Sequence, residues 1–141
     1  MDYDIRPDKG VGPISFGMSP EKVRQALAVD VDAVDGKSDT GIPTDFFAGP
    51  GILVYYKQPG VCEAVEFAGP ASPTFNGQHF LGRSYREMEQ WVKTRDPEFV
   101  QNDAGLTSNQ FGFGLYAPSS RKEPDLPVEG VIVFEKGYYE D

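Results

Sequence analysis

A short pattern occurs twice in this sequence, and the repeat is the feature that most constrains the fold. Residues 12 to 27 and 77 to 92 each contain a glycine, a turn, a serine suited to cap a helix, and an amphipathic stretch, at a constant offset of 65. The matched pairs are Gly12 and Gly77, Phe16 and Leu81, Gly17 and Gly82, Ser19 and Ser84, Val23 and Met88, Ala26 and Trp91, and Leu27 and Val92.

An approximate echo follows each helical pattern, where residues 61–65 resemble 127–131 at an offset of 66. We therefore predict an α+β fold built from a duplicated helix-plus-β-hairpin unit, with a mostly antiparallel sheet and two helices packed on one face. The halves, about 10–75 and 76–141, are each marginal alone. We expect them to share one continuous sheet in a single domain, 1–141.

Both expected helices begin with capping residues. Ser19 stands before Pro20, which suits the first helical position. Ser84 and Glu87 form the pattern of a capping box. The second helix is expected to end near Arg95, because a proline follows two residues later.

Alternating apolar residues and turn residues predict the strands. A helix is expected to cover the bare face of the strand that holds Gly112 and Gly114, with approach by a partner as the alternative. The predicted strands are 45–48, 51–57, 61–68, 99–101, 110–117 and 128–135.

The chain is acidic, with 13 basic and 22 acidic residues and a net charge of −9. This balance argues against nucleic acid as a partner and favours either a basic protein partner or simple solubility. The N-terminus lacks the pattern of a signal peptide, and the apolar stretches 52–56 and 131–134 are too short to span a membrane. We therefore expect a cytoplasmic protein that does not bind membranes.

The sequence contains no obvious catalytic set. His79 is the only histidine and Cys62 the only cysteine; we interpret the former as a part-buried strand residue and the latter as a small buried hydrophobe. Pairs such as Glu63 and Glu66 leave acid–base chemistry open. We expect no enzyme activity, no catalytic residue, no cofactor and no metal site.

Two groups of residues are candidates for binding a partner. An acidic segment could attract a basic protein, or could be an ordinary solvated loop. Exposed tyrosines beside carboxylates at the C-terminus would suit an interface, or could form a frayed tail. The candidates are Asp30, Asp32, Asp35 and Asp39 in the first group and Tyr138, Tyr139 and Glu140 in the second.

Residues 12–19, followed by Glu21 and Val23, resemble the openings of small bacterial immunity proteins encoded beside polymorphic or contact-dependent growth inhibition toxins. The resemblance covers most of the chain through short structural motifs, which include 51–56, 62–67, 128–134 and 137–139. The Gly-Met-Ser helix opening also resembles repeats of an outer-membrane assembly lipoprotein and of a secreted β-lactamase inhibitor. The sequence shows neither their signal-peptide pattern nor a lipidated cysteine, and from this departure we expect a cytoplasmic inhibitor.

The resemblance implies an immunity protein that binds and neutralises a cognate toxin domain by covering its active or target-binding surface. It assigns no contact residues, because such surfaces differ between immunity proteins of one fold. The alternative is a small-molecule-binding or enzymatic α+β domain with a pocket near Trp91 and His79. A third interpretation is a subunit of a housekeeping assembly.

Overall fold

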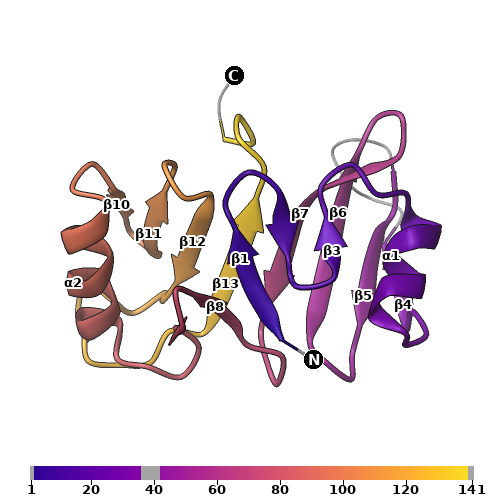
Figure 1. Cartoon of the computed structure of the whole chain (residues 1–141). Coiled ribbons are helices and arrows are strands. Elements are labelled where there is room, and N and C mark those ends of the chain that lie inside the picture. Colours follow the sequence, from indigo (N-terminus) through magenta and orange to yellow (C-terminus); the bar gives the residue numbers. More distant parts are fainter. Residues whose placement is uncertain (1, 36–41, 140–141) are drawn as a thin grey trace.

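The computed structural model of the chain describes residues 2–35 and 42–139, with the side chains of 33–35 left undescribed (Figure 1). Predicted contact residues Asp39 and Glu140 therefore lie outside the described residues. In chain order the elements are β1 (Tyr3–Arg6), β2 (Gly10–Val11), β3 (Ile14–Ser15), α1 (Pro20–Leu27), β4 (Ala33–Asp35), β5 (Thr44–Phe47), β6 (Ile52–Lys57), β7 (Val61–Phe67), β8 (Pro73–Phe75), β9 (Gln78–His79), α2 (Tyr85–Arg95), β10 (Val100–Asn102), β11 (Gly105–Ser108), β12 (Phe113–Tyr116) and β13 (Gly130–Phe134).

The strands form two sheets. The small sheet has the order β3-β2-β1-β8-β9, and the large sheet has the order β10-β11-β12-β13-β7-β6-β5-β4. Every pair in the large sheet is antiparallel, whereas β1 and β8 of the small sheet pair in parallel. The predicted α+β class with mostly antiparallel strands is confirmed, but the small sheet was not foreseen. In Figure 1 the small sheet lies in front of the centre of the large sheet, with α1 and α2 on either side of it.

The helices begin where the caps predict. The Ser19 side chain accepts a hydrogen bond from the Lys22 N–H, and α1 starts at Pro20. The Ser84 side chain accepts from the Glu87 N–H at 3.5 Å, and α2 ends at Arg95 as predicted. Local capping chemistry thus fixes the helix bounds.

One predicted strand is wrong in part. The structure divides the region of the predicted strand 110–117 into a turn followed by β12, and it contains a further strand, β11, that the sequence analysis missed. Gly112 adopts a φ of +74°, and its N–H donates to the Ser108 carbonyl at 2.8 Å. These two features turn the chain from β11 into β12, so residues 110–112 cannot extend the strand.

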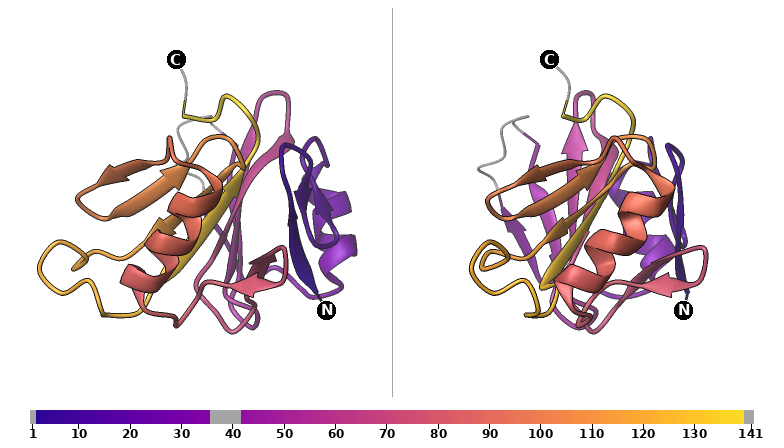
Figure 2. Two further views of the ribbon diagram at one scale, coloured as in Figure 1. Left: turned by 60° about the vertical axis from the view of Figure 1, so that its left-hand side comes forward. Right: turned by 90° about the vertical axis from the view of Figure 1, so that its left-hand side faces the viewer.

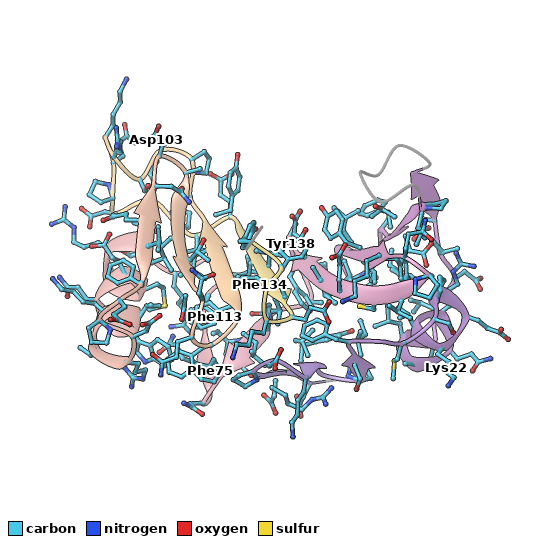
Figure 3. All side chains as sticks on the ribbon, turned by 90° about the horizontal axis from the view of Figure 1, so that it is seen from above. Lys22, Phe75, Asp103, Phe113, Phe134 and Tyr138 are labelled. Atoms are coloured by element: carbon cyan, nitrogen blue, oxygen red, sulfur yellow. The ribbon has the colours of Figure 1, made fainter. Side chains whose placement is uncertain are left out.

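The hydrophobic core lies between the large sheet and a second layer, which consists of the small sheet and the two helices (Figure 2). The ring of Phe75 lies 5.8 Å from that of Phe113, and both are buried (Figure 3). Trp91 meets Phe75 and Phe80 edge to face, with ring centroids 6.2 and 5.5 Å apart. Cys62 is fully buried in β7. Trp91 therefore packs against the aromatic core of the protein.

The same backbone hydrogen bonds join each helix opening to a later strand. In each half, two bonds connect the residues just before the helix to the segment that begins β7 or leads into β13. They run from Gly17 N–H to Cys62 O, Cys62 N–H to Met18 O, Gly82 N–H to Val128 O, and Val128 N–H to Arg83 O, at 2.8 to 3.0 Å.

A buried carboxylate connects α1 to the large sheet. Asp45 in β5 is only 1% exposed, and the Arg24 guanidinium donates to both of its oxygens at 2.7 and 3.0 Å. The Tyr56 hydroxyl donates to the same carboxylate at 2.9 Å. A buried charge is tolerated when it is paired and hydrogen-bonded, as this one is.

Replacing Arg24 with methionine should lower the free energy of unfolding by about 2 to 3 kcal/mol, because the Asp45 charge would stay buried without its cation. This is less than for a fully buried pair, since Arg24 is 41% exposed. Urea denaturation measures the loss. The matched control is Arg86→Met on α2, which breaks an exposed ion pair with Asp125. It should lower the free energy of unfolding by less than about 1 kcal/mol. Equal losses in the two variants would contradict this account of Asp45.

Candidate functional site

One face of the large sheet points away from the core. Glu66 lies between Val65 and Phe67, and Ile132 lies between Val131 and Val133; all four flanking residues are buried in the core. Because side chains alternate along a strand, Glu66 and Ile132 point to the opposite face. We call this the open face. Paired residues cross it in one row: Phe46, Leu53, Glu66, Ile132, Gly114, Thr107 and Val100.

The open face exposes large apolar and aromatic side chains. Of the six exposed large hydrophobic residues in the described chain, four lie on or beside it, which concentrates them on one surface. A gathering of this kind is typical of an interaction surface. The four are Phe46, Val100, Tyr116 and Tyr139, with 37%, 51%, 52% and 56% of their surface exposed.

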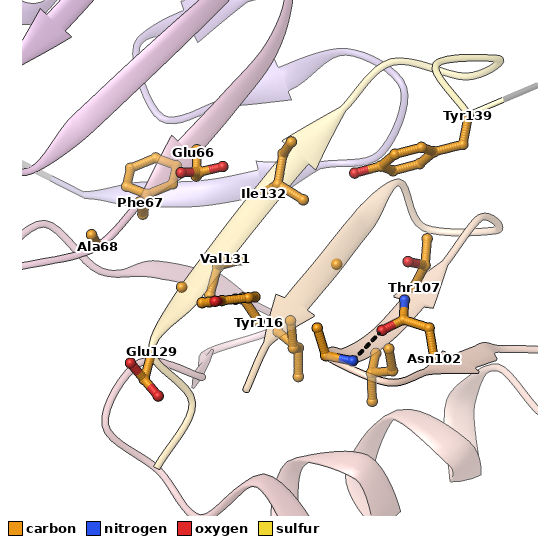
Figure 4. A pocket seen from close by; sticks show the side chains of 15 residues that line it. Glu66, Phe67, Ala68, Asn102, Thr107, Tyr116, Glu129, Val131, Ile132 and Tyr139 are labelled. Atoms are coloured by element: carbon orange, nitrogen blue, oxygen red, sulfur yellow. Dashed lines mark hydrogen bonds between the residues drawn. The ribbon is translucent and has the colours of Figure 1, made fainter. Parts of the chain in front are cut away.

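A hollow of ≈ 420 Å³ lies in the half of the open face formed by β7 and β10 to β13 (Figure 4). Its floor includes Gly114 and Gly130, which contribute no side chains. A methyl group placed at Gly114 would meet Ile132 Cγ2 at 3.2 Å and Thr107 Oγ1 at 3.6 Å. The two glycines therefore leave this part of the floor without side chains.

Glu66 stands among tyrosines at one side of the hollow. The Tyr55 hydroxyl donates to Glu66 Oε1 at 3.3 Å. Phe134 is buried beneath Tyr138 and Tyr139, with ring centroids 5.7 and 4.9 Å from its own. Figure 3 shows Phe134 and Tyr138 close together near the centre of the molecule. The C-terminal turn is thus held on the open face by aromatic packing.

The hollow carries negative charge. Glu66 and Glu129 line it, and the described residues around it include no lysine or arginine. Neither carboxylate takes part in an ion pair within 2–35 and 42–139. Aromatic rings beside an unneutralised carboxylate suit a cationic group.

The structure separates the two predicted contact groups. Asp30 is exposed and lines a different hollow, beside α1. Asp32 is exposed, and its carboxylate accepts the Ala48 N–H at 2.7 Å, which stabilises the chain where it enters β4. Asp35 is in β4, but the placement of its side chain lies outside the described residues. These aspartates stay predicted contacts.

Two residues of the second predicted group, Tyr138 and Tyr139, lie at the open face. Tyr139 is exposed and lines the hollow, whereas Tyr138 is half-buried against Phe134. Sequence reasoning missed Glu66 and Gly114 as parts of the same surface. The period-two alternation of β7, with Glu66 between buried residues, was the pattern that could have identified the open face.

The prediction that a helix covers the bare face of the glycine-containing strand is wrong at Gly114. The residues around the hollow come from strands and loops of the described chain, with none from α1 or α2. The atoms closest to a methyl group at Gly114 belong to β11 and β13. The alternative of an approaching partner therefore remains open at this glycine.

His79 also differs from expectation. It lies in strand β9 but is exposed, and its Nδ1 is 2.9 Å from the Ser72 hydroxyl. The two line a hollow near the N-terminus together with Thr74, whose hydroxyl donates to Asp4. Exposure at the sheet edge explains why His79 is not part-buried: β9 is the outermost strand of the small sheet.

Within the described residues no helix is both long and apolar enough to cross a membrane. Comparison with protein-family models, with curated proteins and with solved structures finds no match to this chain.

Three tyrosines, Tyr55 and Tyr139 at the open face and Tyr85 in α2, should give the stability of the protein a pH dependence. Burial, and secondly the Glu66 carboxylate, raise the pKa values of Tyr55 and Tyr139. Burial raises the pKa of Tyr85 to about 12. Because folding favours the neutral phenols, their contribution to stability is complete below the ordinary pKa of about 10 and is lost as pH rises through the folded values.

We predict that these tyrosines ionise only above about pH 10 in the native protein and near about pH 10 in concentrated urea. Tyrosinate absorbance against pH measures this, and Tyr55→Phe should remove one late group. Native titration with a single midpoint near the ordinary value would contradict the burial of these phenols.

Proposed function

We propose that this chain is an immunity protein that binds and neutralises a cognate bacterial toxin domain by covering its active or target-binding surface. The single observation that carries the proposal is the open face of the large sheet. It presents exposed aromatic side chains around a hollow that the helices do not fill. Such a surface suits a protein partner better than water.

Charge supports a basic partner. The chain has a net charge of −9, and the carboxylates of Glu66 and Glu129 line the hollow. Toxins that act on nucleic acid need positive surfaces to bind phosphates. An acidic inhibitor would associate rapidly with such a surface and would occupy the place of the nucleic acid. In this proposal the immunity protein itself acts in the cytoplasm.

We further propose that the fold is a duplication of one unit. In the first half the paired row runs through Ala33, Phe46, Leu53 and Glu66, and in the second half through Val100, Thr107, Gly114 and Ile132. These rows occupy matching strands, which supports two copies packed with their helices on one face. Glu66 and Ile132 are themselves paired, so the copies would meet at equivalent positions.

The duplication accounts for the position of the hollow. Where the first copy has Leu53, the second has Gly114, and where the first has Phe46, the second has Thr107. Large side chains fill the face of one copy, while small ones leave space on the other. In this proposal the hollow arises from a difference in side-chain size between the two copies.

The alternative function is a small-molecule-binding or enzymatic domain. The observation that favours it is the volume of the hollow, ≈ 420 Å³, which lies within the range of ligand pockets. A metabolite bound there would be recovered with the purified protein, in the absence of any partner polypeptide. Mass spectrometry of the denatured and extracted protein distinguishes the two functions.

The proposal predicts that the tagged protein, purified from its host at low and moderate salt, recovers one basic polypeptide in stoichiometric amount. Expression of that polypeptide alone should stop growth, and co-expression of this chain should restore it. Thr107→Phe should abolish recovery and rescue, because it places in the hollow the residue found at the equivalent position of the first copy.

The matched control is Thr94→Phe, the same change on the exposed side of α2. It should bind and protect as the wild type does. Recovery of the chain without any polypeptide, under conditions that express its neighbouring genes, would contradict the proposed function. Equal loss in both variants would contradict the placement of the binding surface.

A further inference from the structure

We propose that the hollow on the open face receives an arginine side chain of the bound protein, whose guanidinium pairs with Glu66. The inference rests on the proposed function, since it presumes a protein partner. It goes further, because it names the chemical group that the surface recognises. Three features of the hollow favour this group: the charge of Glu66, the tyrosine rings and the glycine floor.

Glu66 carries a charge that the described residues do not neutralise. Two carboxylates elsewhere on or beside the large sheet are paired with cations: Asp45 with Arg24, and Glu135 with Lys57. Glu66 receives only the Tyr55 hydroxyl among the described hydrogen bonds, and no ion pair of 2–35 and 42–139 includes it. A partner cation would supply the missing charge.

The aromatic walls favour a planar cation. Tyr116 and Tyr139 line the hollow and are each more than half exposed. Tyr139 is held in place by Phe134 and Tyr138, with ring centroids 4.9 and 4.8 Å away. A ring that is already held loses little conformational freedom on binding. A guanidinium stacks on tyrosine faces and binds a carboxylate through two N–H groups, whereas an ammonium acts as a point charge.

The glycine floor gives a long side chain access to Glu66. Gly114 is paired with Ile132, and Ile132 is paired with Glu66, so the three positions are adjacent in one row across the sheet. Gly130 continues the floor two residues before Ile132 on the same face. An extended arginine stem can lie over these glycines and place its guanidinium at the carboxylate.

Blocked tripeptides provide the probe. We would titrate isotope-labelled full-length protein with blocked Gly-Arg-Gly, with Gly-Lys-Gly, and with the citrulline peptide, which has the shape of arginine without its charge. Amide NMR shifts measure binding. The arginine peptide should shift Gly114, Gly130 and Ile132; the lysine peptide should bind several-fold more weakly, and the citrulline peptide should produce no shifts there.

Glu66→Gln keeps an acceptor for Tyr55 but removes the charge, and it should weaken binding of the arginine peptide about tenfold. Glu123→Gln makes the same change in net charge at an exposed position of the loop before β13, and it should bind as the wild type does. The amide spectrum of each variant shows whether it is folded. Undisturbed binding by folded Glu66→Gln, or absence of shifts at the hollow, would overturn the proposal.

The peptide titration and the recovery experiment test the arginine site and the immunity function separately. If a toxin is recovered and Thr107→Phe loses it while Glu66→Gln retains full affinity, the immunity function stands and the arginine site falls. If the arginine peptide binds at the hollow in a Glu66-dependent manner but no toxin is recovered, the cation site stands and the immunity function falls.

Discussion

Strands β7 and β13 pair antiparallel from Phe67 and Val131 to Ala64 and Phe134, and this pairing brings the two ends of the molecule into one sheet. Each strand is otherwise the last of four antiparallel neighbours, β4 to β7 on one side and β13 to β10 on the other. Without the pairing of β7 with β13, each of these two strands would have an unpaired edge, which proteins ordinarily protect. The pairing also places Glu66 and Ile132 side by side at the middle of the open face.

Buried and exposed carboxylates have different roles in this arrangement. Asp45 is buried and bound by Arg24 and Tyr56, so its charge serves to attach α1 to the sheet. Glu66 is part-exposed beside tyrosines and a hollow, with no cation among the described residues of that hollow. In our account the first acid stabilises the fold and the second recognises the partner.

The sequence predicted the features that short-range chemistry decides. The caps at Ser19 and Ser84 located both helices, because capping depends on residues within one turn. The parallel pairing of β1 with β8 was missed, since it joins segments about 70 positions apart without a local pattern. The turn at Gly112 was also missed, because alternation of phenylalanine and glycine through it imitates a continuous strand.

The candidate site was predicted only in part. Tyr139 was found as a partner-binding candidate because exposed aromatics beside acids are typical of interfaces. Glu66 and Gly114 were not, since a single acid or glycine in a strand has many explanations until strand register brings the two together. The prediction of a helix over Gly114 was wrong because sequence alternation separates the two faces of a strand without identifying which face the helices cover.

The most direct test of the central claim is amide hydrogen exchange of the complex formed with the recovered partner. Our account predicts added protection along β7 and β10 to β13, including the segment that leads to Tyr139, with unchanged exchange in the exposed turns of α2. Protection confined to the segment around Asp30 and Asp32, with the large sheet unaffected, would contradict the open face as the binding surface.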